Sequence, residues 1–330
     1  MGTKNLYNQM RHEVHEMYQR GYGTGAADRK NLRQQGEHVV TMKQTQKQME
    51  AVCRRYADWM KETHPEVRKM EQAREYVREY SDSLKERYSA ATVHTYTDRL
   101  NQVLHTDVRT SRAGAVPTKG RDASSEINSR ADKLPGYSPR LSNFAEAVGI
   151  RRAEYADLKY KDIQHDEQGW KVIVEHGKGG KYQEQRILPQ HERAVEKIYL
   201  QGRDEPERYV FSRSEMTNKI DLHEMRRNIA REAYEGYLGR IRGEEGYADR
   251  LYNQLKDTYQ SRNPGRELPR DFRLIEQDGY GSVYKTRGDV RKNLKQRGCA
   301  TKYNRLAALA TSVNHLSHWR CDVTIQNYFR

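Results

Sequence analysis

The sequence has few cysteines and no long apolar run. Cys53, Cys299 and Cys321 lack Cys-x-x-Cys spacing, which favours neither a disulfide framework nor a zinc site and points to a reducing compartment. The first residues, Met1–Asn5, contain no apolar signal core, and no uninterrupted apolar run approaches the roughly 20 residues that span a membrane. We therefore expect a soluble cytoplasmic protein with no membrane partner.

Acidic residues are in deficit. The chain has 60 Lys and Arg against 46 Asp and Glu, a net charge of +14 over 330 residues. Such an excess indicates a polyanionic partner, most often nucleic acid, although a solvated charged surface explains any one segment equally well. Phe and Trp are scarce, whereas 23 Tyr supply rings that pack and hydroxyls that hydrogen-bond a phosphate or a partner.

Residues 1–107 are expected to form a small helical bundle. Each of four segments has one apolar stripe at helical spacing, and glycine, His64-Pro65 or a cap-like serine separates them. The expected helices carry Leu6 to Met17, cover about 41–63 and 67–87, and run from Ser89 to Leu104.

The rest of the chain is expected to form a linker and a second domain. Residues 108–133 hold Gly, Pro, Ser and Arg without apolar periodicity, which suits either a basic arm along phosphates or a plain flexible linker. Within 134–330, the extended segments 170–174 and 182–188 flank a glycine-rich turn, which is typical of a hairpin. We therefore predict a mainly α fold with a small β-hairpin or sheet.

Six polar residues, in this order along the chain, could together cleave a phosphodiester. Arginine grips a phosphate bidentately, a proton donor serves the departing sugar oxygen, and a tyrosine can attack phosphorus. The candidates are Arg151, Lys178, His223, Arg226, His318 and Tyr328.

Local patterns place some of these residues. Arg151 is aligned with Tyr155 and Leu158 on a helical stripe, so it should point inward, either toward an anion or into an ion pair with Glu154. His223 and Arg226, three residues apart, should leave one helix face. Taken alone, they would be a surface histidine and a DNA-backbone arginine.

The remaining candidates lie in a turn and near the C-terminal end. Lys178 lies between two glycines at the hairpin tip, where Lys181 is the competing general acid and simple solvation is the alternative. His318 follows an apolar helix, and Tyr328 lies on a final short helix for which Asp322 looks like the cap. A tyrosine at such a position normally serves packing.

This set of residues, together with the helical N-terminal part, resembles the tyrosine recombinase (phage integrase) family. The resemblance implies a helical core-binding domain at 1–107 and a mixed α+β catalytic domain at 134–330. It also implies that Arg151 and Arg226 hold the scissile phosphate, Lys178 is the general acid, His223 and His318 assist, and Tyr328 is the nucleophile. No metal or nucleotide cofactor is implied.

The sequence departs from the family pattern in places. Ser317 stands where the family usually has glycine, and Tyr328 comes one residue later than its commonest spacing. Residues 236–300 look inserted, as either a DNA- or partner-contacting element or a passive surface subdomain. The C-terminal helix that family members dock onto a neighbour is expected to be missing or truncated.

The resemblance implies DNA strand exchange through a 3′-phosphotyrosyl intermediate, for integration or excision of a mobile element. Expected partners are double-stranded DNA, three further copies of the chain in a homotetramer on two DNA sites, and an accessory DNA-bending protein, all at the nucleoid. Two alternatives stay open: a type IB topoisomerase-like relaxing enzyme, and a catalytically silent DNA-binding accessory or regulatory protein.

The basic excess generates a salt prediction. If the chain contacts many DNA phosphates, the logarithm of its DNA affinity should fall with the logarithm of salt concentration by about 0.9 per phosphate contacted. Titrations of a labelled duplex at several salt concentrations measure this slope. A nearly flat response would remove nucleic acid as the partner.

Overall fold

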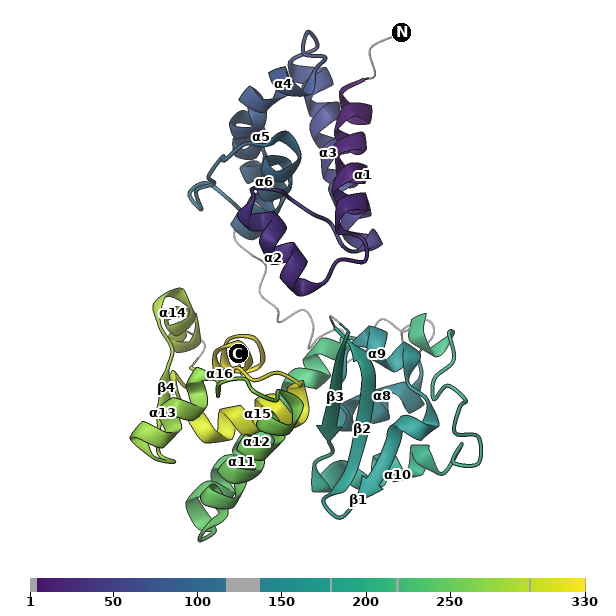
Figure 1. The fold of residues 1–330 in the computed structure, drawn as a ribbon, viewed down its shortest axis with the longest axis vertical. Helices are drawn as coiled ribbons and strands as arrows, with labels where there is room; N and C mark the ends of the chain where they lie inside the picture. Colours follow the sequence, from purple (N-terminus) through teal and green to yellow (C-terminus); the bar gives the residue numbers. More distant parts are fainter. Residues whose placement is uncertain (1–4, 117–136, 179, 218–219, 297, 330) are drawn as a thin grey trace. The chain divides into compact units, whose positions relative to one another are not determined.

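The structure is a computed structural model that describes residues 5–116, 137–178, 180–217, 220–296 and 298–329. The chain divides into two compact units, Met1–Gly120 and Arg121–Arg330 (Figure 1). The division lies within the segment 108–133 that the sequence analysis assigns to a linker, of which residues 117–133 lie outside the described residues. The chain is mainly helical with two small antiparallel sheets, which confirms the predicted fold class.

The first unit is a helical bundle with a methionine-rich core. Its core includes Met10, Met17, Met49, Tyr56 and Met60, each at most 1% exposed. The predicted first, second and fourth helices are confirmed. The elements are α1 (Leu6–Gly21), α2 (Ala26–Gln34), α3 (Lys43–Thr63), α4 (Met70–Ala73), η1 (Arg74–Tyr76), α5 (Val77–Ser83), η2 (Leu84–Glu86) and α6 (Ala90–Leu104).

Two features of this unit differ from the sequence prediction. Helix α2 was not predicted, because its sequence holds one large apolar residue, Leu32, and therefore no stripe. The single helix predicted at 67–87 is broken by two 3-10 turns. Where α4 ends, the Ala73 carbonyl accepts a hydrogen bond from the hydroxyl of Tyr56 in α3, a tertiary contact that local periodicity does not encode.

The second unit begins with helices and a three-stranded antiparallel sheet in the order β1-β2-β3. The predicted hairpin is confirmed as β2 and β3, whereas β1 was not predicted because it is only four residues long. These elements are α8 (Pro139–Ala147), α9 (Arg152–Asp157), η4 (Tyr160–Asp162), β1 (Ile163–Asp166), β2 (Gly169–Gly177), β3 (Lys181–Arg186), η5 (Pro189–His191), α10 (Glu192–Tyr199) and η6 (Glu215–Thr217).

The rest of the second unit is helical and includes the segment that looked inserted. Residues 236–243 continue a long helix, and the following helices share one core with the C-terminal helices. The elements are α11 (Leu222–Gly243), α12 (Tyr247–Arg262), α13 (Arg270–Asp278), β4 (Val283–Lys285), α14 (Gly288–Gln296), β5 (Lys302–Asn304), α15 (Arg305–Leu316) and α16 (Cys321–Tyr328). None of the helices in the described ranges is both long enough and apolar enough to cross a membrane.

A close backbone contact at the end of α1 generates a stability prediction. A Cβ on Gly21 would lie 2.7 Å from the carbonyl carbon of Val40, which is a backbone atom and cannot swing away as a side chain could. Gly21→Ala should therefore lower the free energy of unfolding of the first unit by about 1–3 kcal/mol. Native-state hydrogen exchange measures each unit separately.

Gly236→Ala is the matched control. Gly236 is exposed in the interior of α11, and a Cβ there meets nothing within 4 Å. The same added methyl group should leave stability unchanged or raise it by up to about 1 kcal/mol. If Gly21→Ala behaves like Gly236→Ala, the contact with Val40 does not constrain the bundle.

Candidate functional site

Helix α11 presents His223 and Arg226 from its first turn. The Asp221 side chain accepts hydrogen bonds from the backbone amides of His223 and Glu224 and so caps the helix start. Because the two residues are three positions apart, they leave the same side of the helix, as predicted. His223 is exposed, whereas Arg226 points into the protein and is 1% exposed.

Arg226 connects three distant segments. Its guanidinium donates hydrogen bonds to the carbonyl of Gly149, to the carbonyl of Leu316 at 2.8 Å, and from Nε to the hydroxyl of Tyr328 at 3.3 Å. Burial lowers the pKa of Arg226, and the positive charge of Arg151 lowers it further. No carboxylate among the described residues forms an ion pair with Arg226.

Tyr328 lies within the same cluster. It is on the last turn of α16 and is 7% exposed. Its ring centroid is 5.4 Å from that of His223 and 6.2 Å from that of His318, and the Arg226 guanidinium carbon is 5.5 Å from it. The chain therefore brings its C-terminal tyrosine to the two histidines and the buried arginine.

Helix α16 begins differently from the prediction. Its N-cap is Arg320, and Asp322 lies inside the first turn, so the assignment of Asp322 as the cap was wrong. Asp322 instead pairs with Arg320 at 2.6 Å, and the amide of Cys321 donates to the carboxylate of Asp271 in α13. The short sequence 321–328 cannot reveal a partner fifty residues away.

Arg151 precedes helix α9 and does not lie within it. Its backbone is extended, and its side chain is 30% exposed. The prediction that Arg151 lies on the inward stripe of the helix was therefore wrong, because the helix begins one residue later, at Arg152. Its guanidinium pairs with Glu154 at 2.7 Å, which is the ion pair that the sequence analysis gives as the alternative. Burial opposes ionisation of Glu154, but hydrogen bonds from the Arg151 backbone and side chain give a lowered pKa.

Glu154 also contacts the hairpin. One of its oxygens accepts hydrogen bonds from the side chain of Gln183 at 2.8 Å and from the backbone amide of Lys178 at 3.4 Å. The side chain of Lys178 is exposed, and no contact joins it to the other five candidates within the described residues. The side chain of the competing Lys181 lies outside the described part of the chain.

His318 follows the residue that ends α15 in a left-handed backbone conformation, and Ser312 holds its ring. Ser317, at φ 57°, ends α15, and Ser312 Oγ lies 2.7 Å from Nδ1 of His318. Nε2 of His318 is buried and has no hydrogen-bond partner among the described residues. Burial, together with the charges of Arg226 and Arg151, lowers the pKa of His318 to about 4, so the imidazole is neutral at pH 7.

A cavity of about 320 Å³ opens where these segments meet. Three arginines, one histidine and one carboxylate, that of Asp221, line it, so positive groups outnumber the negative one. It is lined by Ile150, Arg151, Arg152, Ile220, Asp221, Leu222, His223 and Arg226. Arg151, His223 and Arg226 line this cavity, whereas Tyr328 and His318 do not. Tyr328 contacts Arg226 and both histidines, and no contact joins the Lys178 side chain to this group within the described residues.

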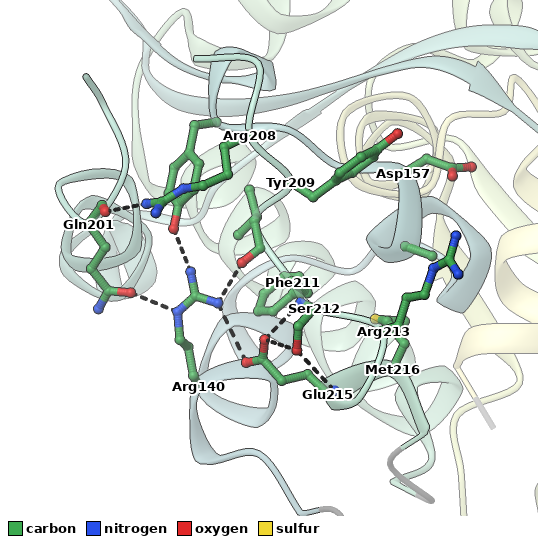
Figure 2. Close-up of a pocket in the computed structure, with 13 residues that line it drawn as sticks. Arg140, Asp157, Gln201, Arg208, Tyr209, Phe211, Ser212, Arg213, Glu215 and Met216 are labelled. Carbon is green, nitrogen blue, oxygen red and sulfur yellow. Dashed lines mark hydrogen bonds and ion pairs between the residues drawn. The ribbon is translucent and has the colours of Figure 1, made fainter. Parts of the chain in front are cut away.

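A second, larger cavity of about 770 Å³ lies elsewhere in this unit and contains Arg140, Arg208 and Arg213 (Figure 2). Arg140 already donates to the Tyr160 hydroxyl, to the Val210 carbonyl and to Gln201, and it pairs with Glu215 at 3.5 Å. Because protein groups satisfy Arg140, this cavity lacks the unpaired buried charge of the first.

Two positioning residues were not identified as such from the sequence. Ser312 lies six residues before His318 and shares no recognisable spacing with it. Glu154 was considered only as an ion-pair partner, whereas it also joins the hairpin. Across the described ranges, no three His, Cys, Asp or Glu side chains are placed to hold a metal ion.

The sequence matches no protein-family model and no curated protein. Among solved structures, the chain is similar to XerH site-specific recombinase bound to difH substrate in a pre-cleavage complex (11% identity, 98% of this chain and 92% of that chain, TM-score 0.42). It is also similar to the XerH post-cleavage complex with palindromic difH (12%, 98% and 90%, 0.41) and to XerA recombinase (15%, 79% and 100%, 0.25).

Two buried histidines generate a pH prediction. Burial lowers the pKa of His315 to about 4, and the pKa of His318 is also lowered to about 4. Between pH 4 and about 6.5 the unfolded chain binds protons that the folded chain refuses, so stability should fall as pH falls through this range. Each histidine contributes up to about 1.4 kcal/mol per pH unit.

Hydrogen exchange of the second unit between pH 7 and 4.5 measures this slope. His318→Gln or His315→Gln should make the slope shallower by the share of one histidine, while His12→Gln, at an exposed position of α1, is the matched control. An unchanged slope in both buried variants would show that these imidazoles do not resist protonation.

Proposed function

We propose that this protein cuts and rejoins DNA strands through a covalent 3′-phosphotyrosyl intermediate formed on Tyr328. Arg151 and Arg226 hold the nonbridging oxygens of the scissile phosphate, and Tyr328 attacks phosphorus. Lys178 donates a proton to the departing 5′ oxygen, with Lys181 as the alternative donor. Breakage of the ester bond and formation of the phosphotyrosine occur together, so the bond energy is conserved for rejoining.

The observation that carries this proposal is the buried guanidinium of Arg226. A charge that is 1% exposed is rarely left without a counter-ion, because burial without a partner costs several kcal/mol. Its described partners are carbonyls and a tyrosine hydroxyl, and none is a carboxylate. A phosphate in the adjoining cavity would supply the missing negative charge.

The histidines suit assisting roles. Nε2 of His318 has no described partner, and the neutral ring, in the tautomer with its proton on Nε2, donates a hydrogen bond to a phosphate oxygen at pH 7 in this proposal. His223 lies at the cavity wall within 5.4 Å of the Tyr328 ring, measured between centroids. In this proposal both rings, which lie near the Tyr328 ring, assist the transfer of the proton that leaves the hydroxyl as the ester forms.

The order of the six residues along the chain supports a finer proposal. A site-specific recombinase would act as a homotetramer on two DNA sites, for integration or excision of a mobile element, aided by a DNA-bending protein at the nucleoid. The helical first unit and the basic excess are consistent with two domains that both contact DNA. DNA flanking the encoding locus is where covalent adducts should be mapped.

Two alternatives predict different products. A type IB topoisomerase-like enzyme would relax supercoiled plasmid as a monomer without paired sites. A silent DNA-binding protein would bind but form no covalent adduct at all. Relaxation of a plasmid lacking any paired site would favour the first, whereas strand exchange only between paired sites favours the recombinase.

Removal of the Tyr328 hydroxyl tests the proposal. Tyr328→Phe keeps the ring that packs in the core beside Ile325 but deletes the attacking oxygen. It should bind DNA with nearly unchanged affinity and reduce covalent complex on nicked suicide substrates by about 10³-fold or more. Gel analysis of phosphotyrosyl adducts measures this reduction.

Tyr303→Phe is the matched control. Tyr303 is a buried tyrosine of the same core, 5% exposed, and its hydroxyl donates to the carbonyl of Ala300. This variant should still form the adduct. A Tyr328→Phe protein that becomes trapped on DNA as the wild type does would remove Tyr328 from the mechanism.

A further inference from the structure

Positive charge is concentrated at the end of the segment that looked inserted, 236–300, and in the two residues after it. Residues 285–302 hold seven Lys and Arg against one Asp, a net charge of +6 out of +14 for the whole chain. They cover the end of β4 and helix α14, both labelled in Figure 1, and the start of β5. None of the reactions proposed above uses these residues.

Two of these positive charges lie close enough to repel each other when no anion is bound. Lys285 of β4 and Lys302 of β5 are direct cross-strand partners, so their side chains leave the same face of a two-stranded sheet. Like charges opposite one another destabilise a sheet. Both are exposed, and neither forms an ion pair with a described residue.

A cavity of about 680 Å³ adjoins this sheet. Five cations and two carboxylates line it, and each carboxylate already pairs with one arginine: Asp271 with Arg305, and Asp322 with Arg320. The three cations that remain are exposed and form no ion pair within the described chain. They are Arg270, Lys285 and Arg287.

The cavity adjoins the loop that carries His318. Trp319 and Arg320, the next two residues, form part of its wall, as does Gln326 of α16. Gln326 and Tyr328 are two positions apart on this helix, so they face roughly opposite sides. The cavity and the phosphate site are therefore on two sides of the same short helix.

Asp271 holds these parts together. Its carboxylate pairs with Arg305, the first residue of α15, and accepts from the amide of Cys321, the first residue of α16. The inserted segment is thereby attached to the two helices that position His318 and Tyr328. A partner bound in the cavity would lie at a set distance from the cleavage point.

We propose that this basic surface, defined as Arg270, Lys285, Arg287, Arg291, Lys292, Lys295 and Lys302, binds backbone phosphates of DNA beside the strand that is cut. The proposal rests on the proposed function for its choice of DNA as the polyanion. Neutralised phosphates release counterions, which supplies the binding energy and its salt dependence. The surface extends the DNA footprint beyond the catalytic cavity.

A charge-neutralising pair tests this inference by binding alone. Lys285→Gln/Arg287→Gln is compared with Arg193→Gln/Lys197→Gln, two exposed cations of α10 that form no described ion pair. Both pairs are made in the Tyr328→Phe background, so the result does not depend on covalent chemistry. Fluorescence anisotropy with a labelled duplex gives the dissociation constant between about 50 and 200 mM salt.

The first pair should weaken binding roughly tenfold and reduce the salt slope by about 1 for each phosphate that is no longer neutralised, about 2 in all. The α10 pair should change both quantities much less. A weakening no larger than that of the α10 pair overturns the inference. If polyglutamate displaces the duplex as readily as unlabelled duplex does, an acidic polypeptide fits the surface and the assignment to DNA is overturned.

The two proposals fail in different ways. If the Tyr328→Phe protein binds no DNA, the proposed function itself is overturned. If it binds DNA but the two charge pairs are indistinguishable, only the inference about the basic surface is overturned. Thermal unfolding of each variant confirms that the exposed substitutions leave the fold intact.

Discussion

The arrangement of the second unit depends on the buried guanidinium of Arg226. Its hydrogen bonds reach the carbonyls of Gly149 and Leu316 and the hydroxyl of Tyr328, so one side chain connects the segments before Arg151 and before His318 to the last helix. These bonds satisfy polar groups but not the charge. The same hydrogen bonds thus stabilise the fold but leave the positive charge of Arg226 without a negative partner among the described residues.

Residues around the site orient the candidates without touching the cavity. Glu154 connects Arg151 to the hairpin that carries Lys178, and Ser312 holds one ring nitrogen of His318. Each contact removes rotational freedom from a polar side chain, which keeps the charged and neutral groups at constant separation. The exposed Lys178 side chain lacks such a contact within the described residues, which suits a group that meets its target only when a ligand is present.

The segment 236–300 is structurally continuous with helices α15 and α16, which precede His318 and carry Tyr328. Leu251 and Phe272 belong to the same apolar core as Leu309 and Tyr328. Because the Asp271 carboxylate also accepts a hydrogen bond from the amide of Cys321 at the start of α16, the segment is firmly attached to that helix. The segment therefore helps to build the core that holds α15 and α16, and DNA binding by its basic residues is proposed separately.

The sequence alone determined the features that depend on short-range spacing. The shared face of His223 and Arg226 follows from helical geometry, the hairpin at Lys178 follows from glycine between extended segments, and the mainly helical fold follows from repeated apolar stripes. Such patterns involve neighbours within a turn or two. They are therefore visible in the order of residues.

Only the tertiary structure decided how these pieces meet. The carbonyl partners of Arg226 have no side-chain signature, so nothing in the sequence marks Gly149 or Leu316 as acceptors. Ser312 and Asp271 form hydrogen bonds with His318 and Cys321, which only folding brings near them. Helix α9 begins at Arg152, so Arg151 lies outside it. Backbone hydrogen bonds and ion pairs across long sequence separations form only once the core has packed, because packing sets the distances on which they depend.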